Sequence, residues 1–384
     1  MIARRRSGGT DIGFETDLII ITPPAFRRAA LSYGAAFNSG GLTMIRLQAT
    51  PPTSVDDAIA MLQTAIGIEF GTLPPYLYAK FSILPGTNGA AVDRLGMIVG
   101  QEMIHLCLVC NIVNALGGTP KLVAPVYPCT LGDIGPPGGD PLMIHLLPFG
   151  PDAMAQGMAI EEPEEVPPYE VVGLLKAQGG AMTIGQYYAV IDAFLATLPA
   201  SAWTPGNNQI TDAQFFPGQL FAVNGYADAH LAIQQIVSEG EGAKDNPLDF
   251  QNELAHFYRF GELFYDKVLT KIPQEPGYQW GPEPLGVDWS AAYPAIPDPG
   301  SHDFSKDSAA AQSAQAACNA AYTGMIDALQ LAVTGQAGQL GAAVRKMFDL
   351  RMAAMAALQI PLADGKSVAG PSFLYTPAAS GASS

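Results

Sequence analysis

Two Glu-x-x-His pairs carry the clearest chemical signal in this sequence. Glu102 and His105 form the first pair, and Glu253 and His256 form the second. Residues three apart share one face of a helix, so each pair offers a carboxylate and an imidazole to the same neighbour. Both groups are ligands of divalent transition metals. A chain with 5 histidines rarely contains two such pairs by chance, so the repeat indicates a metal site.

The first pair lies in a helical hairpin. Its stripe steps by three and four residues and is otherwise apolar, which is typical of a helix in a bundle; its members are Leu95, Ile98, Glu102, His105, Val109, Ile112 and Leu116. The preceding helix is expected to begin after Ser54 as its N-cap, to kink or restart at Pro74-Pro75, and to present Glu69 on its core face. The second helix is expected to stop at Gly117-Gly118.

The second pair is expected in another hairpin, over 226–270, after a long crossover at about 119–225. Its first helix would present Glu241, which continues the face of His230, Ile233 and Val237. Glu239 is the alternative, because a regular helix cannot point both residues to the core. The last bundle helix is expected to begin near Leu248 and to carry both Glu253 and His256.

Together these residues predict a dinuclear metal centre. Four glutamates nearly neutralise two dications, which makes burial of the cluster tolerable, and each ion receives one imidazole. Iron is the expected metal, with manganese and zinc as alternatives; no separate catalytic residue is assigned. The predicted ligands are Glu69, Glu102, His105, Glu241, Glu253 and His256.

Other polar motifs are interpreted as structural. The acidic run Glu161-Glu162-Pro163-Glu164-Glu165 is expected to be a solvated surface rather than a metal site. Cys107 and Cys110 form a C-x-x-C inside the apolar run and are expected to be core residues. His145, His230 and His302 lack a spaced partner and are expected to have structural or surface roles.

Composition limits the classes of function. The 384 residues are 48% hydrophobic and 14% charged, as expected for a globular protein with a large core. A net charge of −16 argues against binding nucleic-acid phosphates. No run reaches the length of a membrane span or of a secretory signal, so a cytoplasmic protein without a membrane partner is expected.

The flanking regions complete the predicted organisation. Residues 1–53 are expected to be an N-terminal extension, 54–375 one domain with the crossover as an insertion, and 376–384 a flexible tail. The Pro/Gly/Trp-rich stretch 271–308 predicts a loop wrapped on the body. Two Ala-rich helices are expected at 309–333 and 336–357. The fold class is therefore all-α: a four-helix bundle with long loop insertions and additional C-terminal helices.

Several blocks resemble one known family. They are Ile68-Glu69 with Thr72 and Pro74-Pro75-Tyr76-Leu77, Glu102-Met103 with His105-Leu106, Asn114-Ala115 with Gly117-Gly118, Gly240-Glu241-Gly242, His256 to Phe260, and Gly370 to Phe373. This pattern, over about 55–375, is similar to the ferritin-like family that includes the iminophenyl-pyruvate dimer synthases of bisindole pigment pathways. The resemblance implies a ferritin-like four-helix core, the same six metal ligands, and oxidative coupling of imines made from aromatic amino acids.

The expected function is therefore that of a ferritin-like dinuclear-metal oxidoreductase. It would oxidise a small organic substrate, such as an amino-acid-derived imine, with O₂ or peroxide, and a homo-oligomer is compatible with this function. Two alternatives stay open: a metal-binding or iron-handling protein without an organic substrate, and a metal-free ferritin-like scaffold. An apolar cavity at the metals would favour the oxidase, and an acidic channel would favour metal handling.

Overall fold

The computed structural model describes residues 44–136, 139–163, 180–212, 216–242, 246–273 and 277–377, all within one compact unit, Gly40–Ser384. The first 43 residues of the predicted extension and most of the tail lie outside the described residues. The helices are α2 (Val55–Phe81), α3 (Gly89–Ala115), α4 (Pro151–Ile160), α6 (Ile184–Leu195), α7 (Tyr226–Gly240), α8 (His256–Tyr265), α9 (Ala309–Val333) and α10 (Leu340–Ala357). The strands are β1 (Leu47–Ala49), β2 (Gly180–Met182), β3 (Lys267–Lys271) and β4 (Tyr278–Pro284).

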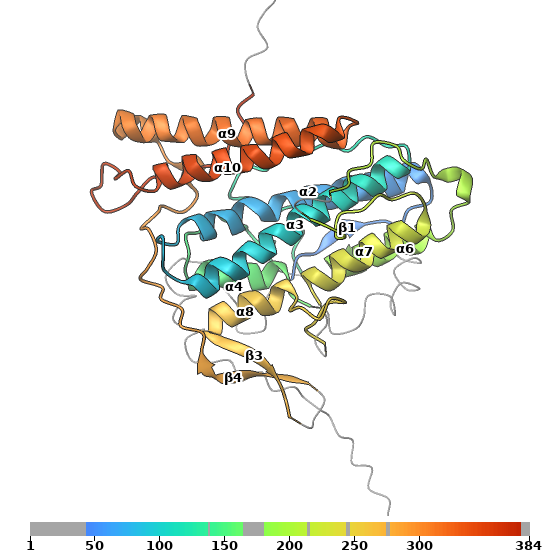
Figure 1. Cartoon of the computed structure of the whole chain (residues 1–384), viewed down its shortest axis with the longest axis horizontal. Coiled ribbons are helices and arrows are strands. Elements are labelled where there is room, and N and C mark those ends of the chain that lie inside the picture. The colour runs from blue at the N-terminus through green and yellow to red at the C-terminus, as the bar shows by residue number, and fades with distance from the viewer. Residues whose placement is uncertain are drawn as a thin grey trace, which may run out of the picture. The chain divides into compact units, whose positions relative to one another are not determined.

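Two long helices and two interrupted helices form the bundle (Figure 1). Helices α2 and α3 are 27 residues each and make the predicted hairpin. The third bundle helix consists of α4 and α6, both of which contact α2, and the fourth consists of α7 and α8, both of which contact α3. In addition, α4 packs on α8 and α6 packs on α7. The all-α bundle predicted from the sequence is confirmed.

The second half of the bundle differs from its prediction in two places. The stretch 119–225 is more than a crossover, because it contains α4 and α6 and thus the whole third bundle helix. The helix predicted to begin near Leu248 begins later, since α8 begins at His256 and the preceding residues form an antiparallel bridge between Leu248 and Leu254. Glu253 therefore lies outside the helix, and the Glu253/His256 spacing does not place the two side chains on one helical face.

Local capping signals set several helix ends as predicted. Ser54 and Asp57 form a capping box at the start of α2. Thr183 forms another with Gln186 at the start of α6. Helix α3 ends at Ala115, where Gly117 takes a positive φ of 80° and Gly118 N–H donates to the Val113 carbonyl at 2.9 Å. This is the left-handed end that glycine makes easy.

Helix α2 continues through Pro74 and Pro75 without the predicted restart. Proline has no N–H, so Pro75 leaves the Gly71 carbonyl without its helical donor. The Tyr127 hydroxyl supplies that donor, at 2.6 Å. The helix therefore remains continuous next to Glu69 because a crossover side chain replaces the missing hydrogen bond.

Two buried asparagines of α3 fix the long connection between α6 and α7. Asn111 Nδ2 donates to the carbonyls of Ile210 and Phe221 at 2.7 and 2.8 Å, and its Oδ1 accepts the N–H of Ile210 at 2.8 Å. Asn114 Nδ2 donates to the carbonyls of Asn208 and Val333 at 3.0 and 2.8 Å. Backbone groups that would otherwise be buried without partners are satisfied in this way.

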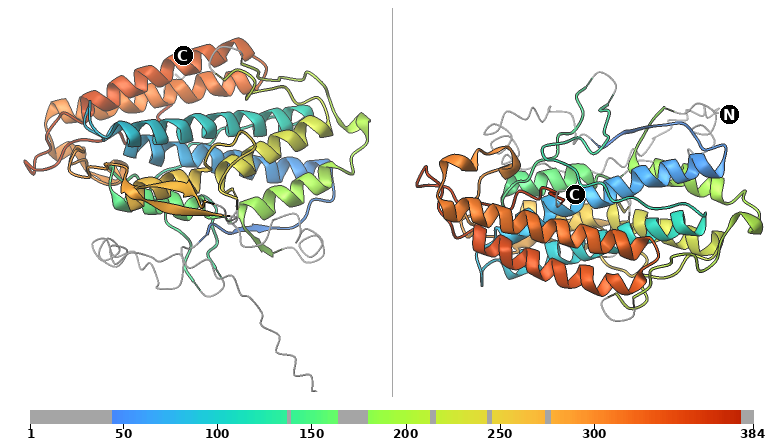
Figure 2. Two further views of the ribbon diagram at one scale, coloured as in Figure 1. Left: turned by 60° about the horizontal axis from the view of Figure 1, so that its bottom comes forward. Right: turned by 90° about the horizontal axis from the view of Figure 1, so that it is seen from above.

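The remaining elements cover the bundle. Helices α9 and α10 pack on each other and lie along one side of it, in contact with α3 and α2 respectively (Figure 2). Helix α9 has the predicted bounds, 309–333. Helix α10 starts four residues later than the predicted 336–357 and ends where predicted. Strand β1 pairs with β2, and β3 pairs with β4; β4 lies within the stretch that was predicted as a loop.

One described helix, α3, is long and apolar enough to cross a membrane. Most of that apolar stretch, 78% of it, is buried inside the protein. The helix also carries Glu102 and His105 in its buried part. Helix α3 therefore has the properties of a central core helix.

The role of Tyr127 in α2 can be tested by removing one hydroxyl. Tyr127→Phe leaves the Gly71 carbonyl buried and unpaired, so the free energy of unfolding is expected to fall by about 1–3 kcal/mol. Tyr187→Phe is the matched control, because the Tyr187 hydroxyl donates to the Met61 carbonyl at 3.0 Å, which the regular helix already satisfies. Urea denaturation followed by circular dichroism measures both. Equal losses in the two variants would contradict this account.

Candidate metal centre

Six buried acidic and imidazole side chains meet at the level where the third and fourth bundle helices are interrupted. Helix α2 contributes Glu69, and α3 contributes Glu102 and His105. Glu161 directly follows α4, Glu239 lies one residue before the end of α7, and His256 is the first residue of α8. All six are at most 6% exposed.

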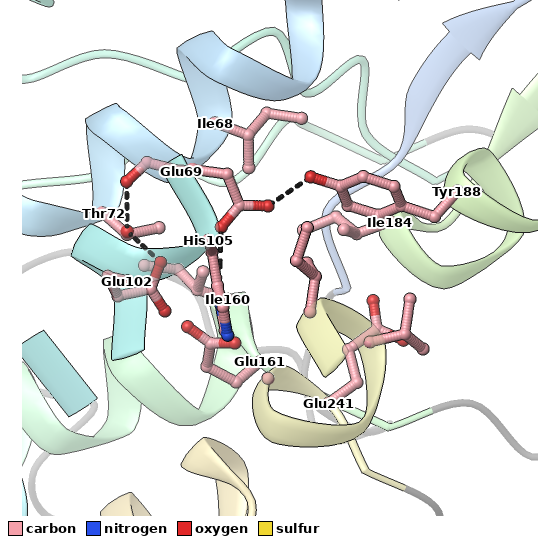
Figure 3. A pocket seen from close by; sticks show the side chains of 13 residues that line it. Ile68, Glu69, Thr72, Glu102, His105, Ile160, Glu161, Ile184, Tyr188 and Glu241 are labelled. Atoms are coloured by element: carbon pink, nitrogen blue, oxygen red, sulfur yellow. Dashed lines mark hydrogen bonds and ion pairs between the residues drawn. The ribbon is translucent and has the colours of Figure 1, made fainter. Parts of the chain in front are cut away.

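Three hydroxyl groups orient three of the carboxylates. The Tyr188 hydroxyl donates to Glu69 Oε1 at 2.5 Å, Thr72 donates to Glu102 Oε2 at 2.8 Å, and Tyr76 donates to Glu161 Oε1 at 2.6 Å. In each carboxylate the hydroxyl contacts one oxygen only, and the Thr72 hydroxyl also lies 2.9 Å from the Glu69 backbone carbonyl. Figure 3 shows these carboxylates turned toward a common centre.

The second oxygen of each carboxylate faces the Nδ1 atom of a histidine. His105 Nδ1 lies 3.6 Å from Glu69 Oε2. His256 Nδ1 lies 2.9 Å from Glu102 Oε1 and 3.7 Å from Glu161 Oε2. The two imidazole rings are stacked with their centroids 5.6 Å apart. Carboxylate oxygens and imidazole nitrogens thus converge on two neighbouring points.

The opposite ring nitrogens have partners of their own. His105 Nε2 is 2.8 Å from Glu239 Oε2, and His256 Nε2 is 3.2 Å from Gln101 Oε1. An Nε2–H donated to these oxygens leaves the Nδ1 lone pair directed at the carboxylates, which is how metal-ligating histidines are usually fixed. His256 Nδ1 is fully buried and makes no hydrogen bond of acceptable geometry. A buried nitrogen of this kind fits a metal ligand.

The geometry defines two groups of donors that share one residue. The first is Glu69, Glu102 and His105, and the second is Glu102, Glu161 and His256; in each group one ligand atom from every residue lies within 4.8 Å of the others. Both groups are buried, and either could hold a metal ion. Because Glu102 belongs to both, it is in position to bridge two ions.

The charges of the cluster are strongly coupled. Burial and the neighbouring Glu161 carboxylate raise the pKa of Glu102 to about 7. Burial alone would lower the pKa of His256, but the close approach of the Glu102 and Glu161 carboxylates to its Nδ1 raises it to about 9. The pKa of His105 is likewise raised, against the effect of burial, by Glu239 and Glu69. Protons therefore compensate the buried carboxylates unless a cation replaces them.

A cavity of about 30 Å³ opens beside the carboxylates. One wall carries the ligand groups of Glu69, Glu102 and His105, with Glu161. Glu241 lies across the cavity from the cluster (Figure 3). The apolar side chains that line it are Ile68, Ile160, Ile184, Ile236 and Val237.

Four of the six predicted ligands are brought together: Glu69, Glu102, His105 and His256. Glu241 lines the same cavity, but its Oε1 accepts the Gly185 N–H at 2.8 Å. Glu253 does not reach the cluster. Its side chain is 46% exposed and forms an ion pair with Arg259 at 2.8 Å, because the segment before α8 is a turn closed by the Leu248–Leu254 bridge rather than a helix.

Glu161 and Glu239 join the cluster although they were not among the predicted ligands. The acidic run starting at Glu161 was predicted as a solvated surface, yet Glu161 is buried against Tyr76. The spacing could have predicted the burial of Glu161, because Glu161 lies three residues after the buried Met158 and seven after the buried Met154. Glu239 similarly lies three residues after the buried Ile236, and it is the alternative to Glu241 on α7.

Comparisons with known proteins agree with this architecture. The sequence profile of the family described as Ferritin-like matches residues 62–265, the stretch that runs from within α2 to the end of α8 and contains all six clustered residues. A crystal structure described as a ferritin-like protein from Caulobacter vibrioides has a TM-score of 0.56 at 20% identity, covering 85% of this chain and all of that one. No curated protein matches. Both the family profile and the fold lead to one conclusion: this chain belongs to the ferritin-like family.

Proposed function

We propose that this protein binds two divalent transition-metal ions and acts as an oxidoreductase that uses O₂ or peroxide. The observation that carries the proposal is the pair of buried donor groups that share Glu102. Three carboxylates and two imidazoles are the donor set that suits iron, with manganese and zinc as alternatives. Bound iron would supply the redox chemistry with the oxidant.

The protein's own residues would prepare the site in three ways. Tyr188, Thr72 and Tyr76 each donate a hydrogen bond to one oxygen of a carboxylate, so that the other oxygen is available to a metal ion. Glu239 and Gln101 fix the two imidazoles. Burial excludes bulk water, which strengthens every electrostatic interaction within the cluster. Because the side chains are already oriented, they need to move little when a metal ion binds.

The volume of the cavity limits the size of the oxidant and of the substrate that can reach the cluster. About 30 Å³ accommodates molecules of the size of water or O₂, whereas pockets for organic ligands measure roughly 300–1,000 Å³. The apolar side chains of the lining can admit a neutral oxidant such as O₂, and this supports an oxidoreductase. An imine substrate, which the resemblance to the pigment-pathway synthases suggests, would have to react at the rim of this cavity or after it widens.

Metal stoichiometry tests the proposal directly. The wild-type protein is expected to bind two Fe²⁺ ions per chain under anaerobic conditions and to consume O₂ when air is admitted. Glu102→Gln keeps the shape of the shared ligand but removes its charge, so both ions should bind at least about 10-fold more weakly. Equilibrium dialysis with elemental analysis measures the ions, and an oxygen electrode measures the consumption.

Glu253→Gln is the matched control for the Fe²⁺ experiment. Glu253 is part of the resemblance-based ligand set but lies outside the cluster. The Glu253→Gln variant should bind two Fe²⁺ ions per chain and consume as much oxygen as the wild type. A wild-type protein that binds no metal, or a control that loses metal as Glu102→Gln does, would overturn the proposed site.

The raised pKa values predict opposite pH dependences for stability and for metal affinity. Glu102 and His256 have folded-state pKa values of about 7 and 9, above their ordinary values of 4.5 and 6.5. A raised pKa contributes stability that is complete below the unfolded value and is lost as pH rises through the folded one. The melting temperature of metal-free protein should therefore fall between about pH 5 and pH 9.

Metal affinity should rise over the same pH range, because the ions compete with the protons on these ligands. Differential scanning calorimetry of the metal-free protein and Fe²⁺ titrations at several pH values measure the two trends. Glu102→Gln should remove the part of the stability loss that occurs up to about pH 7 and should also reduce the part due to His256, because Glu102 helps to raise the pKa of His256. A metal-free protein that becomes more stable toward pH 9 would contradict the assigned charges.

A further inference from the structure

The two imidazoles of the centre differ in the partner of the nitrogen that faces away from the shared carboxylate. His105 Nε2 lies 2.8 Å from Oε2 of Glu239, an acidic side chain that is 0% exposed. His256 Nε2 lies 3.2 Å from the amide oxygen of Gln101, which is half-buried. One histidine is therefore backed by a carboxyl group and the other by a neutral amide.

The carboxylates themselves provide little distinction between the two positions. Glu69 and Glu161 each accept one hydrogen bond from a tyrosine, at 2.5 and 2.6 Å. Glu102 belongs to both groups. The histidine partners are thus the main chemical difference between two otherwise similar sets of ligands.

That difference has a defined electrostatic consequence. A carboxylate that accepts the Nε2–H of a bound imidazole makes the other nitrogen a stronger donor and places an additional negative charge near the ion. An amide oxygen orients the ring without adding a charge. In a buried site the added charge acts through a low effective dielectric constant and is felt strongly by a dication.

We propose that the two metal positions are inequivalent and that Glu239 and Gln101 set the order in which they fill. The position formed by Glu69, Glu102 and His105 binds the first ion, and the position formed by Glu102, Glu161 and His256 binds the second, more weakly. This inference rests on the proposed two-ion site. Glu239 and Gln101 act on the ions through the histidines and are positioning residues.

Because both positions use Glu102, the difference in affinity between the first and the second ion becomes larger. Once the first ion binds, part of the Glu102 charge is already engaged, so the second ion meets a less negative ligand set. The two imidazole rings are only 5.6 Å apart, so the second dication also approaches the first against their mutual repulsion. Both effects act on whichever ion binds second.

The proposal can be tested with Co²⁺ as the probe, titrated into metal-free protein by calorimetry with visible absorption as a second readout. The wild type should show two binding steps whose affinities differ by about 10–100-fold. Glu239→Gln should weaken the first step. Gln101→Glu should strengthen the second step, because it places a carboxylate against His256 Nε2 in place of the amide oxygen.

The double variant Glu239→Gln/Gln101→Glu exchanges the two partners and should reverse the order of filling. Crystals grown with one equivalent of Co²⁺ show by anomalous scattering which position is occupied. A merely structural role for these residues would weaken both steps without reversing them. Two equal steps in the wild type, or an unchanged order in the double variant, would overturn this inference alone, whereas a wild type without Co²⁺ binding would also overturn the proposed function.

Discussion

The burial of four glutamates around two imidazoles is the constraint on which the rest of this bundle depends. Each ionised carboxylate removed from water costs several kcal/mol unless other groups compensate it. Tyrosine and threonine hydroxyls compensate part of that cost, and the protonated imidazoles compensate another part. At the proposed site, metal ions would complete the compensation.

The interruptions of two bundle helices place residues of the same cluster at helix ends. The break between α4 and α6 places Glu161 at a helix end, and the break between α7 and α8 places Glu239 and His256 at the two facing ends. Glu239 then contacts His105 while His256 contacts Glu102. A Glu/His pair assembled across the gap thus faces the Glu102/His105 pair, with each carboxylate against the imidazole of the other pair.

Sequence reasoning could predict whatever depends on local periodicity. Glu69, Glu102 and His105 lie on uninterrupted stripes, so their positions followed from the three/four spacing, as did the hairpin. The C-terminal helices were predicted from their Ala-rich composition. Glu161 and Glu239 could not be found as readily, because both lie at helix ends where an insertion interrupts the pattern. Glu253 was selected for its spacing from His256, and spacing has this meaning only inside a helix. The turn at Leu248–Leu254 removes that condition.

Direct localisation of the metal tests the central claim most sharply. Crystals of the protein loaded with excess Fe²⁺ or Mn²⁺ under anaerobic conditions can be measured on both sides of the metal absorption edge. The account predicts two anomalous peaks inside the cluster, one in contact with His105 Nδ1 and one with His256 Nδ1, with Glu102 touching both. A metal bound at Glu253, or no anomalous peak within the cluster, would contradict it.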